Sequence, residues 1–198
     1  MKVLIGIPCS EMLHSRFAQC LLSLGKPEDT QSCFAIGSLI QRNREAIANI
    51  AIESKTDYVL WLDSDMIFRQ DILKRLLELN VNIASGIYFK KEPPFAPEAY
   101  ERVSSIGNIP VSEIPETPFA VEGIGFGCVL TRTDVLRKIK EKEGIIFAPI
   151  GNMGEDMSFC LRARKYGYEI LCDPRIQCGH IGSTVVTEDY YREFHTIQ

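Results

Sequence analysis

The chain has 198 residues, enough for one domain with a substantial core, and a formal net charge of −4. Its hydrophobic content of 45% and charged content of 24% are ordinary for a soluble globular protein. The mild acidity gives no sign of nucleic-acid binding, which relies on clustered Lys and Arg. Seven scattered cysteines without a C-x-x-C pair suggest neither a disulfide framework nor a cysteine zinc site.

The cysteines also indicate the cellular compartment of the protein. Most of them lie among apolar residues, as buried reduced thiols do, so we expect a cytoplasmic protein. The apolar run at 3–7 is too short for a secretory signal, because Pro8 and polar residues follow it at once. No segment of the sequence approaches the length of a membrane span, so we expect no transmembrane segment.

The first 90 residues alternate between strand and helix patterns. Apolar runs and helical periodicity predict strands and helices at these positions: strands at 2–7, 33–36, 57–62 and 82–88, and helices at 12–24, 41–53 and 70–79. Strands alternating with long helices indicate crossover connections and a doubly wound, mainly parallel sheet. Ligands of such sheets bind beyond the carboxyl ends of the strands, where Pro8 and Asp63 fall.

The alternation breaks at residues 89–118, a proline-rich stretch that we interpret as a long loop, either functional or a mobile insertion. The pattern then resumes with these elements: strands at 120–122, 128–130, 168–172 and 176–178, and helices at 131–142 and 155–166. Residues 183–198 are polar with three aromatics, which is compatible with a closing flap or with a frayed terminus.

Asp63-Ser64-Asp65 is the most informative motif, because it ends the strand-forming run 58–62. Two carboxylates at the end of a buried strand are costly unless something neutralises them. A divalent cation would do so, and an ion held by few protein carboxylates takes further oxygens from a substrate phosphate. The alternative is a simple strand-end turn, since Asp and Ser favour turns.

Four landmarks occur in this order: Gln41-Arg42-Asn43-Arg44, Asp63-Ser64-Asp65, Gly123-Ile124-Gly125-Phe126-Gly127 and Gly154-Glu155-Asp156. This order, with a helix ending in Gly167-Tyr168 after it, resembles the GT-A glycosyltransferases, in particular the inverting, family 2-like enzymes of the SpsA-like and rhamnosyltransferase-like kind. The resemblance covers roughly residues 2–182. It implies an α/β fold: a single GT-A domain, with a doubly wound, mixed and mainly parallel sheet flanked by helices.

The resemblance also implies a division of the chain and an activity. Residues 1–182 would form the domain, with 1–90 as its nucleotide-binding half, 91–182 as its acceptor and catalytic half, and 183–198 as a tail or flap. The implied reaction is metal-dependent transfer of a sugar, with inversion, from a nucleotide-diphosphate sugar. The acceptor would be a hydroxyl group on a glycan, a lipid-linked glycan or a protein.

Carried over from the family, Asp65 is the metal ligand, and Asp63 contacts the donor ribose or the metal, with Ser64 between them in the donor site. The family often places a second metal ligand late in the chain, and His180, flanked by Gly179 and Gly182, fits that place. A nitrogen ligand favours Mn2+ over Mg2+, which prefers oxygen, although Mg2+ stays open. The alternative is an ordinary loop or packed histidine.

Asp156 is the candidate general base, because an inverting transferase needs one carboxylate to remove a proton from the acceptor hydroxyl. The first turn of a helix favours the ionised form, so Asp156 would accept a proton at neutral pH. Glu155 would orient its neighbours or contact the acceptor. The alternative is that both acids are present only because first helical turns favour them.

Donor contacts are expected from two places. Pro8 and Ser10 should line the nucleoside pocket, because they follow the first strand. Arg42, Asn43 and Arg44 open the second helix and could meet the diphosphate or the nucleoside, or instead form a solvated helix face. The segment 35–38 lacks the acidic residue that many relatives use to bind the base, which puts a uridine preference in doubt.

Acceptor contacts are expected from Gly125, Phe126 and Gly127. The glycines would let backbone approach a sugar closely, and the aromatic ring would offer an apolar face; a tight turn and core packing are the alternatives.

Two other function classes stay open. A nucleotidyltransferase of similar fold usually carries a Gly- and basic-rich triphosphate loop after its first strand, and the segment 8–12 supplies none. A non-catalytic sugar-nucleotide-binding module would not need the acids and the histidine that this chain retains. The chain is short for the family, so a partner or a second subunit of a homo-oligomer could complete the acceptor site.

Overall fold

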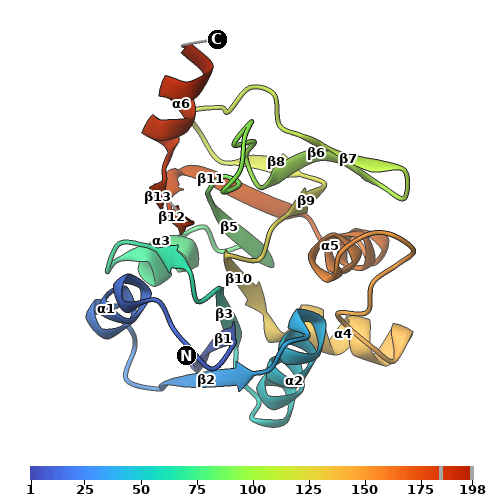
Figure 1. Cartoon of the computed structure of the whole chain (residues 1–198). Coiled ribbons are helices and arrows are strands. Elements are labelled where there is room, and N and C mark those ends of the chain that lie inside the picture. Colours follow the sequence, from blue (N-terminus) through green and yellow to red (C-terminus); the bar gives the residue numbers. More distant parts are fainter. Residues whose placement is uncertain (183–184, 197–198) are drawn as a thin grey trace.

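The computed structural model describes residues 1–182 and 185–196. Its centre is a seven-stranded sheet in the order β2-β1-β3-β10-β5-β11-β8 (Figure 1). The strands of this sheet have the following bounds: β1 (Val3–Cys9), β2 (Thr30–Ile36), β3 (Tyr58–Leu62), β5 (Ile83–Ile87), β8 (Phe119–Val121), β10 (Cys128–Arg132) and β11 (Ile170–Gln177).

Five of the seven strands run in the same direction. β1 is parallel to β2 and β3, and β11 is parallel to β5. β10 lies antiparallel between β3 and β5, and β8 is antiparallel to β11 at the edge. The prediction of a mixed, mainly parallel α/β sheet flanked by helices is therefore confirmed.

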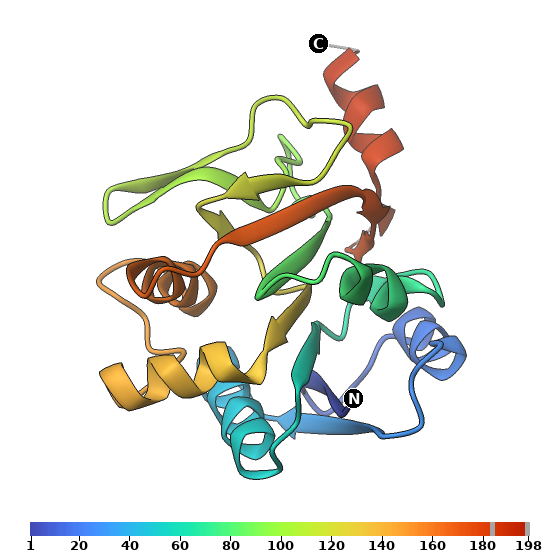
Figure 2. The same cartoon turned by 180° about the vertical axis from the view of Figure 1, so that it is seen from behind.

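Helices cover both faces of the sheet. Figure 1 shows α1 (Ser15–Ser23) and α3 (Ile72–Glu78) on the left, and α2 (Ile40–Glu53), α4 (Thr133–Glu143) and α5 (Glu155–Lys165) on the right. Figure 2 gives the same arrangement from behind. Alternate residues of β1 feed the two cores: Leu4 packs on the α2 side, whereas Val3 and Ile5 pack on the α1 side. A strand buried on both faces is the reason for its unbroken apolar sequence.

The segment 89–118 is not one long loop, which corrects the expectation from its prolines. It contains β6 (Ala99–Ser104) and β7 (Gly107–Pro110), and β6 also pairs with β9 (Gly123–Ile124) in a small sheet. The strand signal was weak because the consecutive charged residues Glu101 and Arg102 interrupt the apolar alternation in β6, and because β7 is an exposed edge strand that tolerates Pro110 at its end.

A further correction concerns the C-terminal part. The strands expected at 168–172 and 176–178 are one strand, β11, which passes through Pro174 with a shift of register between Asp173 and Gln177. A bulge accommodates a proline because that residue donates no ladder hydrogen bond.

Residues 183–184 and 197–198 lie outside the described part of the expected tail, 183–198. The rest is not a frayed end. β12 (Gly179–Ile181) pairs with β13 (Val185–Val186) and with β4 (Met66–Ile67), and α6 (Glu188–Thr196) stands beyond them at the edge of the molecule (Figures 1 and 2). Tyr191 of α6 stacks on Phe89, with ring centroids 4.6 Å apart. Within the described residues, no helix combines the length and the apolar character needed to cross a membrane.

Candidate functional site

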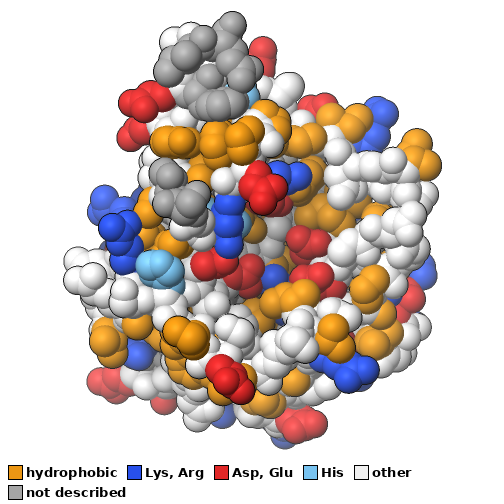
Figure 3. Space-filling view, viewed as in Figure 1, with side chains coloured by type: hydrophobic (Ala, Val, Ile, Leu, Met, Phe, Trp, Pro, Cys, Tyr) orange, Lys and Arg blue, Asp and Glu red, His pale blue; other side chains and the backbone are white. Residues whose placement is uncertain are grey.

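A cavity of about 250 Å³ opens at the carboxyl ends of β1 and β3. Because these strands are parallel neighbours, the residues that follow them meet at one edge of the sheet. The cavity is lined by the following residues: Pro8, Cys9, Ser10, Gly37, Ser38, Ile40, Asn43, Asp63, Ser64, Asp65 and His180. Figure 3 shows acidic side chains gathered in the middle of this face, with a basic side chain among them.

Most of the predicted donor residues line this cavity. Pro8, Ser10, Asn43 and Ser64 all do so. The buried Asn43 amide donates to the carbonyl oxygens of Cys9, at 3.4 Å, and of Gly37, at 3.0 Å. It therefore ties together the turns that follow β1 and β2 and fixes the shape of the pocket.

The two predicted arginines lie apart from the cavity lining. Arg42 is exposed, whereas Arg44 is only 3% exposed. Arg44 donates from Nη2 to both carboxylate oxygens of Asp63, at 3.1 and 3.2 Å, and from Nε to Glu155 Oε1, at 3.1 Å. A buried guanidinium requires partners of this kind, because an unpaired charge in the interior is very costly. Arg44 thus links the two acidic motifs to each other.

The side chain of Asp63 is held mainly by its hydrogen bonds with Arg44. Burial raises the pKa of Asp63 to about 6, although the positive charge of Arg44 opposes the rise. Since both its oxygens are within hydrogen-bond distance of Arg44, Asp63 has less capacity to bind an ion than Asp65 has. Of the two acids in the motif, Asp65 is the more accessible ligand.

Asp65 and His180 meet because β12 pairs with β4, which places His180 opposite Met66. The distance from His180 Nε2 to Asp65 Oδ1 is 3.7 Å. His180 Nδ1 lies 2.9 Å from the carbonyl oxygen of Phe89, and a carbonyl can only accept, so Nδ1 carries the proton. This bond leaves Nε2 unprotonated, with Asp65 Oδ1 nearby, an arrangement typical of metal-binding histidines.

The chemistry of this pair fits a divalent cation. Burial lowers the pKa of His180, which favours the neutral imidazole that a metal needs. One carboxylate and one imidazole leave several positions for phosphate oxygens. Within the described part of the chain, no three His, Cys, Asp or Glu side chains form a complete metal cage, so phosphate or water would have to supply the remaining ligands.

Glu155 and Asp156 begin α5, on the other side of Arg44. Asp156 is half-buried, and its Oδ1 accepts a hydrogen bond from the Met157 amide at 2.7 Å. Burial, and then the negative charge of Glu155, raise the pKa of Asp156 to about 6. A carboxylate with this pKa is ionised at neutral pH and still has enough proton affinity for general base catalysis.

The glycine segment makes room for Tyr88. A Cβ at Gly125 would lie 2.2 Å from Tyr88 Oη, and one at Gly127 would lie 2.8 Å from Cζ of the same ring. The Gly127 amide also donates to Tyr88 Oη at 2.9 Å. Phe126 is 1% exposed and packs against Trp61, so its side chain belongs to the core and offers no face to a ligand.

Two polar residues of the site were missed from the sequence. Lys91 contacts Asp65 through Nζ and Oδ2. Glu98 accepts a hydrogen bond from Tyr100 Oη at 2.7 Å, and its charge contributes to raising the pKa of Asp156. Both residues lie in the segment that the sequence analysis interpreted as a loop. Lys91 and Asp65 are 26 positions apart in the chain, so no local sequence pattern could have predicted their contact.

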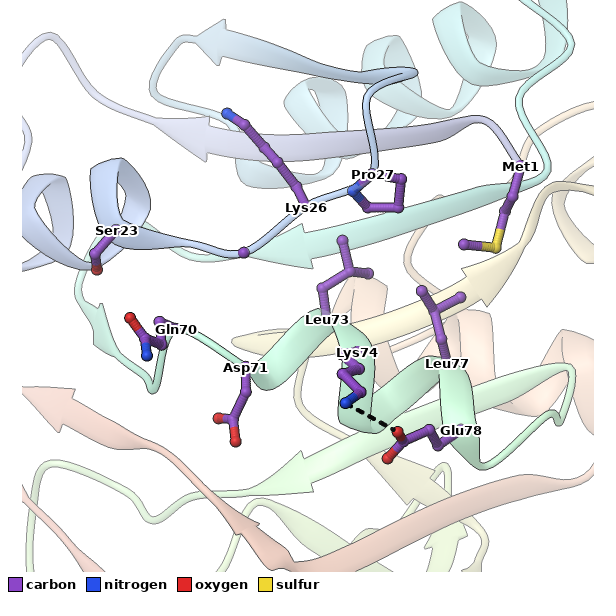
Figure 4. Close-up of a pocket in the computed structure, with 11 residues that line it drawn as sticks. Met1, Ser23, Lys26, Pro27, Gln70, Asp71, Leu73, Lys74, Leu77 and Glu78 are labelled. Carbon is purple, nitrogen blue, oxygen red and sulfur yellow. Dashed lines mark ion pairs between the residues drawn. The ribbon is translucent and has the colours of Figure 1, made fainter.

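A second cavity, of about 630 Å³, lies at the opposite end of β1. Leu73 and Leu77 of α3 point across it toward Pro27 and Met1, and ion-paired Lys74 and Glu78 lie at its side (Figure 4). Its lining is mainly apolar and brings together no histidine or pair of carboxylates comparable to the first cavity. The groups suited to catalysis therefore belong to the cavity at the carboxyl ends of the strands.

By sequence, the chain matches no protein-family model and no curated protein. By structure, it is similar to A197 from STIV, with a TM-score of 0.74 and 20% identity over 96% of this chain and 92% of that one. It is also similar to GalNAc-T7 in the crystal structure with UDP, GalNAc and Mn2+, with a TM-score of 0.61 and 8% identity. That match covers 92% of this chain and 44% of GalNAc-T7. The two likenesses support the GT-A fold predicted from the motifs.

Proposed function

We propose that this protein transfers a sugar from a nucleotide-diphosphate sugar to a hydroxyl acceptor, with a divalent cation and with inversion at the sugar. The observation that carries the proposal is the pairing of Asp65 with His180 beside a cavity at the carboxyl ends of β1 and β3. The fold shared with GalNAc-T7, whose structure contains UDP, GalNAc and Mn2+, supports it. The family 2-like subdivision, and an acceptor on a glycan, a lipid-linked glycan or a protein, belong to the same proposal.

The cavity would hold the donor. The turns containing Pro8, Ser10 and Ser64 would surround the nucleoside, and Asp65 and His180 would hold the cation, with Mn2+ favoured by the imidazole ligand. When bound, the cation supplies positive charge to the diphosphate as the glycosidic bond breaks. Asp63, which Arg44 holds, would accept a hydrogen bond from a donor hydroxyl.

The acceptor would be activated on the other side of Arg44. Asp156 would accept the proton of the attacking hydroxyl, and the resulting oxygen nucleophile would attack the anomeric carbon as the bond to the diphosphate breaks. Arg44 holds Glu155 at 3.1 Å, so it sets where the start of α5 lies relative to the donor motif.

The proposal is tested by ligand-induced stabilisation. Nucleoside diphosphates of several bases are added with and without Mn2+, and the melting temperature is measured, since a ligand of the native state raises it. We expect one nucleotide to stabilise the protein only when Mn2+ is present. Asp65→Ala should abolish this response, whereas Asp71→Ala, at a half-exposed acid that accepts hydrogen bonds from Arg69, should keep it. An unchanged response in Asp65→Ala would contradict the proposed metal site.

A further inference from the structure

Lys91 reaches the metal position from the segment between β5 and β6. Its Nζ contacts Asp65 Oδ2, and both side chains are 35% exposed. Its aliphatic stem runs beside Gly182, where an added Cβ would lie 3.3 Å from Lys91 Cβ and 3.4 Å from Cγ. Because Gly182 follows β12, the strand that carries His180, the stem of Lys91 passes directly beside the candidate ligands.

The backbone around Lys91 is held on both sides. The Lys90 amide donates to the Ala96 carbonyl at 2.9 Å, and the Phe89 carbonyl is the group that fixes His180 Nδ1. Phe89 is buried and also stacks on Tyr191 of α6. The root of the Lys91 side chain is therefore anchored, while its four-carbon stem leaves the ammonium free to change partners.

Asp65 is consequently shared between two groups. Its Oδ1 faces His180 Nε2 and its Oδ2 contacts the Lys91 ammonium. A divalent cation bound between Asp65 and His180 would lie within a few ångströms of that ammonium, and like charges at such a distance repel. The ammonium and the cation therefore compete for one carboxylate.

The donor offers the displaced ammonium another partner. A diphosphate carries negative charge beside the cation, and charge-assisted hydrogen bonds to phosphate are among the stronger polar contacts. The described residues that line the cavity include no Lys or Arg, and Arg44 is already engaged by Asp63 and Glu155. Lys91, which contacts the lining residue Asp65, is thus well placed to reach the diphosphate.

We propose that Lys91 is a tethered counter-ion: it neutralises Asp65 before the cation binds, is displaced by the cation, and then pairs with the donor diphosphate. The proposal rests on the proposed function, because it takes the cation and the donor from there. It makes Lys91 a donor-binding residue whose first partner is the metal ligand. Cation and donor should then bind cooperatively, because the cation displaces the Lys91 ammonium from Asp65 and the donor diphosphate gives that ammonium a new partner.

The test compares Lys91→Met, which keeps an unbranched stem and removes the charge, with Lys90→Met. Lys90 is a matched control, because it is the adjacent lysine and its Nζ lies over the Tyr100 ring, 5.7 Å from the centroid. Binding of Mn2+ alone is measured by calorimetry or by the spectrum of the free ion. Lys91→Met should bind Mn2+ about three- to tenfold more tightly than the parent protein, as removal of one competing, partly exposed charge allows. Lys90→Met should match the parent protein.

The second measurement is binding of the nucleoside diphosphate at saturating Mn2+. Lys91→Met should weaken it about tenfold, as expected for the loss of one charge-assisted contact. Lys91→Arg should keep most of the nucleotide affinity and should bind Mn2+ as weakly as the parent protein. This result would show that the charge of Lys91, rather than its packing, determines both affinities. Melting temperatures of the variants without ligand show that each is folded.

The outcomes separate this inference from the function on which it rests. If Lys91→Met and the parent protein bind Mn2+ equally while Asp65→Ala loses it, the competition is refuted and the metal site stands. If the parent protein binds the nucleotide without Mn2+ and Lys91→Met does not, Lys91 replaces the cation, and the competition is again refuted. If neither Mn2+ nor any nucleotide binds, the proposed function falls together with the inference.

Discussion

The proposed donor side and the proposed acceptor side of this molecule are built in different ways. On the donor side, Ser10 and Asp63 follow parallel strands, so the register of β1 and β3 alone brings them together. On the acceptor side, Glu98 lies in the bend before β6 and Asp156 lies in the first turn of α5, so both belong to connecting segments or a helix start and neither follows a strand of the central sheet. A site at strand ends is fixed by the backbone, whereas a site on connecting segments can change with few substitutions.

Arg44 is the link between the two sides. It belongs to α2, in the proposed nucleotide-binding half, and bonds both Asp63 and, from the proposed catalytic half, Glu155. Substitutions on the two sides should therefore have separate effects on catalysis, stability and pH dependence, whereas a substitution of Arg44 should affect both sides.

The substitution Asp156→Asn should give the largest difference between the two sides. We expect transfer to fall about 10²- to 10⁴-fold, because the variant lacks a proton acceptor for the attacking hydroxyl. Binding of the nucleoside diphosphate with Mn2+ should stay unchanged, since Asp156 does not line the donor cavity. The two measurements are initial transfer rates and calorimetry. Asp134→Asn, at an exposed first-turn acid of α4, is the control. Near-normal transfer in Asp156→Asn would place the base elsewhere, with Glu98 as the next carboxylate to test.

Arg44→Met should lower the free energy of unfolding by about 3–5 kcal/mol, the usual effect of removing one partner from a buried ion pair. It leaves the half-buried carboxylates of Asp63 and Glu155 without their common counter-ion. Urea unfolding measures the change. Arg42→Met, two residues away on the exposed face of the same helix, should alter stability by less than about 0.5 kcal/mol. Equal effects of the two substitutions would show that Arg44 does not link the two sides.

The pH dependence of transfer should reflect the acceptor side. The pKa of Asp156 is about 6 and the base must be ionised, so kcat/KM should fall about tenfold per unit as pH drops below this value. The effect on stability has the opposite sign. Because folding raises this pKa from 3.8, Asp156 contributes most to stability below pH 3.8, and this contribution is lost as pH rises through about 6.

At pH 7.5, Asp156→Asn should therefore unfold at a higher temperature than the parent protein, while transferring less sugar. The asparagine keeps an oxygen for the Met157 amide and removes the buried charge. Thermal unfolding of both proteins at pH 4 and pH 7.5 checks this, and the difference should shrink at the lower pH. A melting temperature below that of the parent protein at pH 7.5 would contradict the raised pKa.

Sequence alone determined the sheet and the acids at its edge. Unbroken apolar runs such as 58–62 predicted buried parallel strands, and the following Asp63-Ser64-Asp65 had to lie at a carboxyl end. His180 was predicted from a family resemblance, and its place beside Asp65 depends on the pairing of β12 with β4. The local sequence pattern can predict these features because a buried strand requires apolar residues along its length, and the direction of the strand determines at which end the following acids lie.

Only the tertiary structure decided which charged groups pair. Arg44 and Arg42 look alike in the sequence, yet one is buried between two carboxylates and the other is exposed. Lys91 lies in a proline-rich stretch without periodicity, and its contact with Asp65 depends on how β5, β6 and β12 are packed. A long, flexible charged side chain can reach partners in many directions, so its partner is set by the fold around it rather than by its neighbours in the chain.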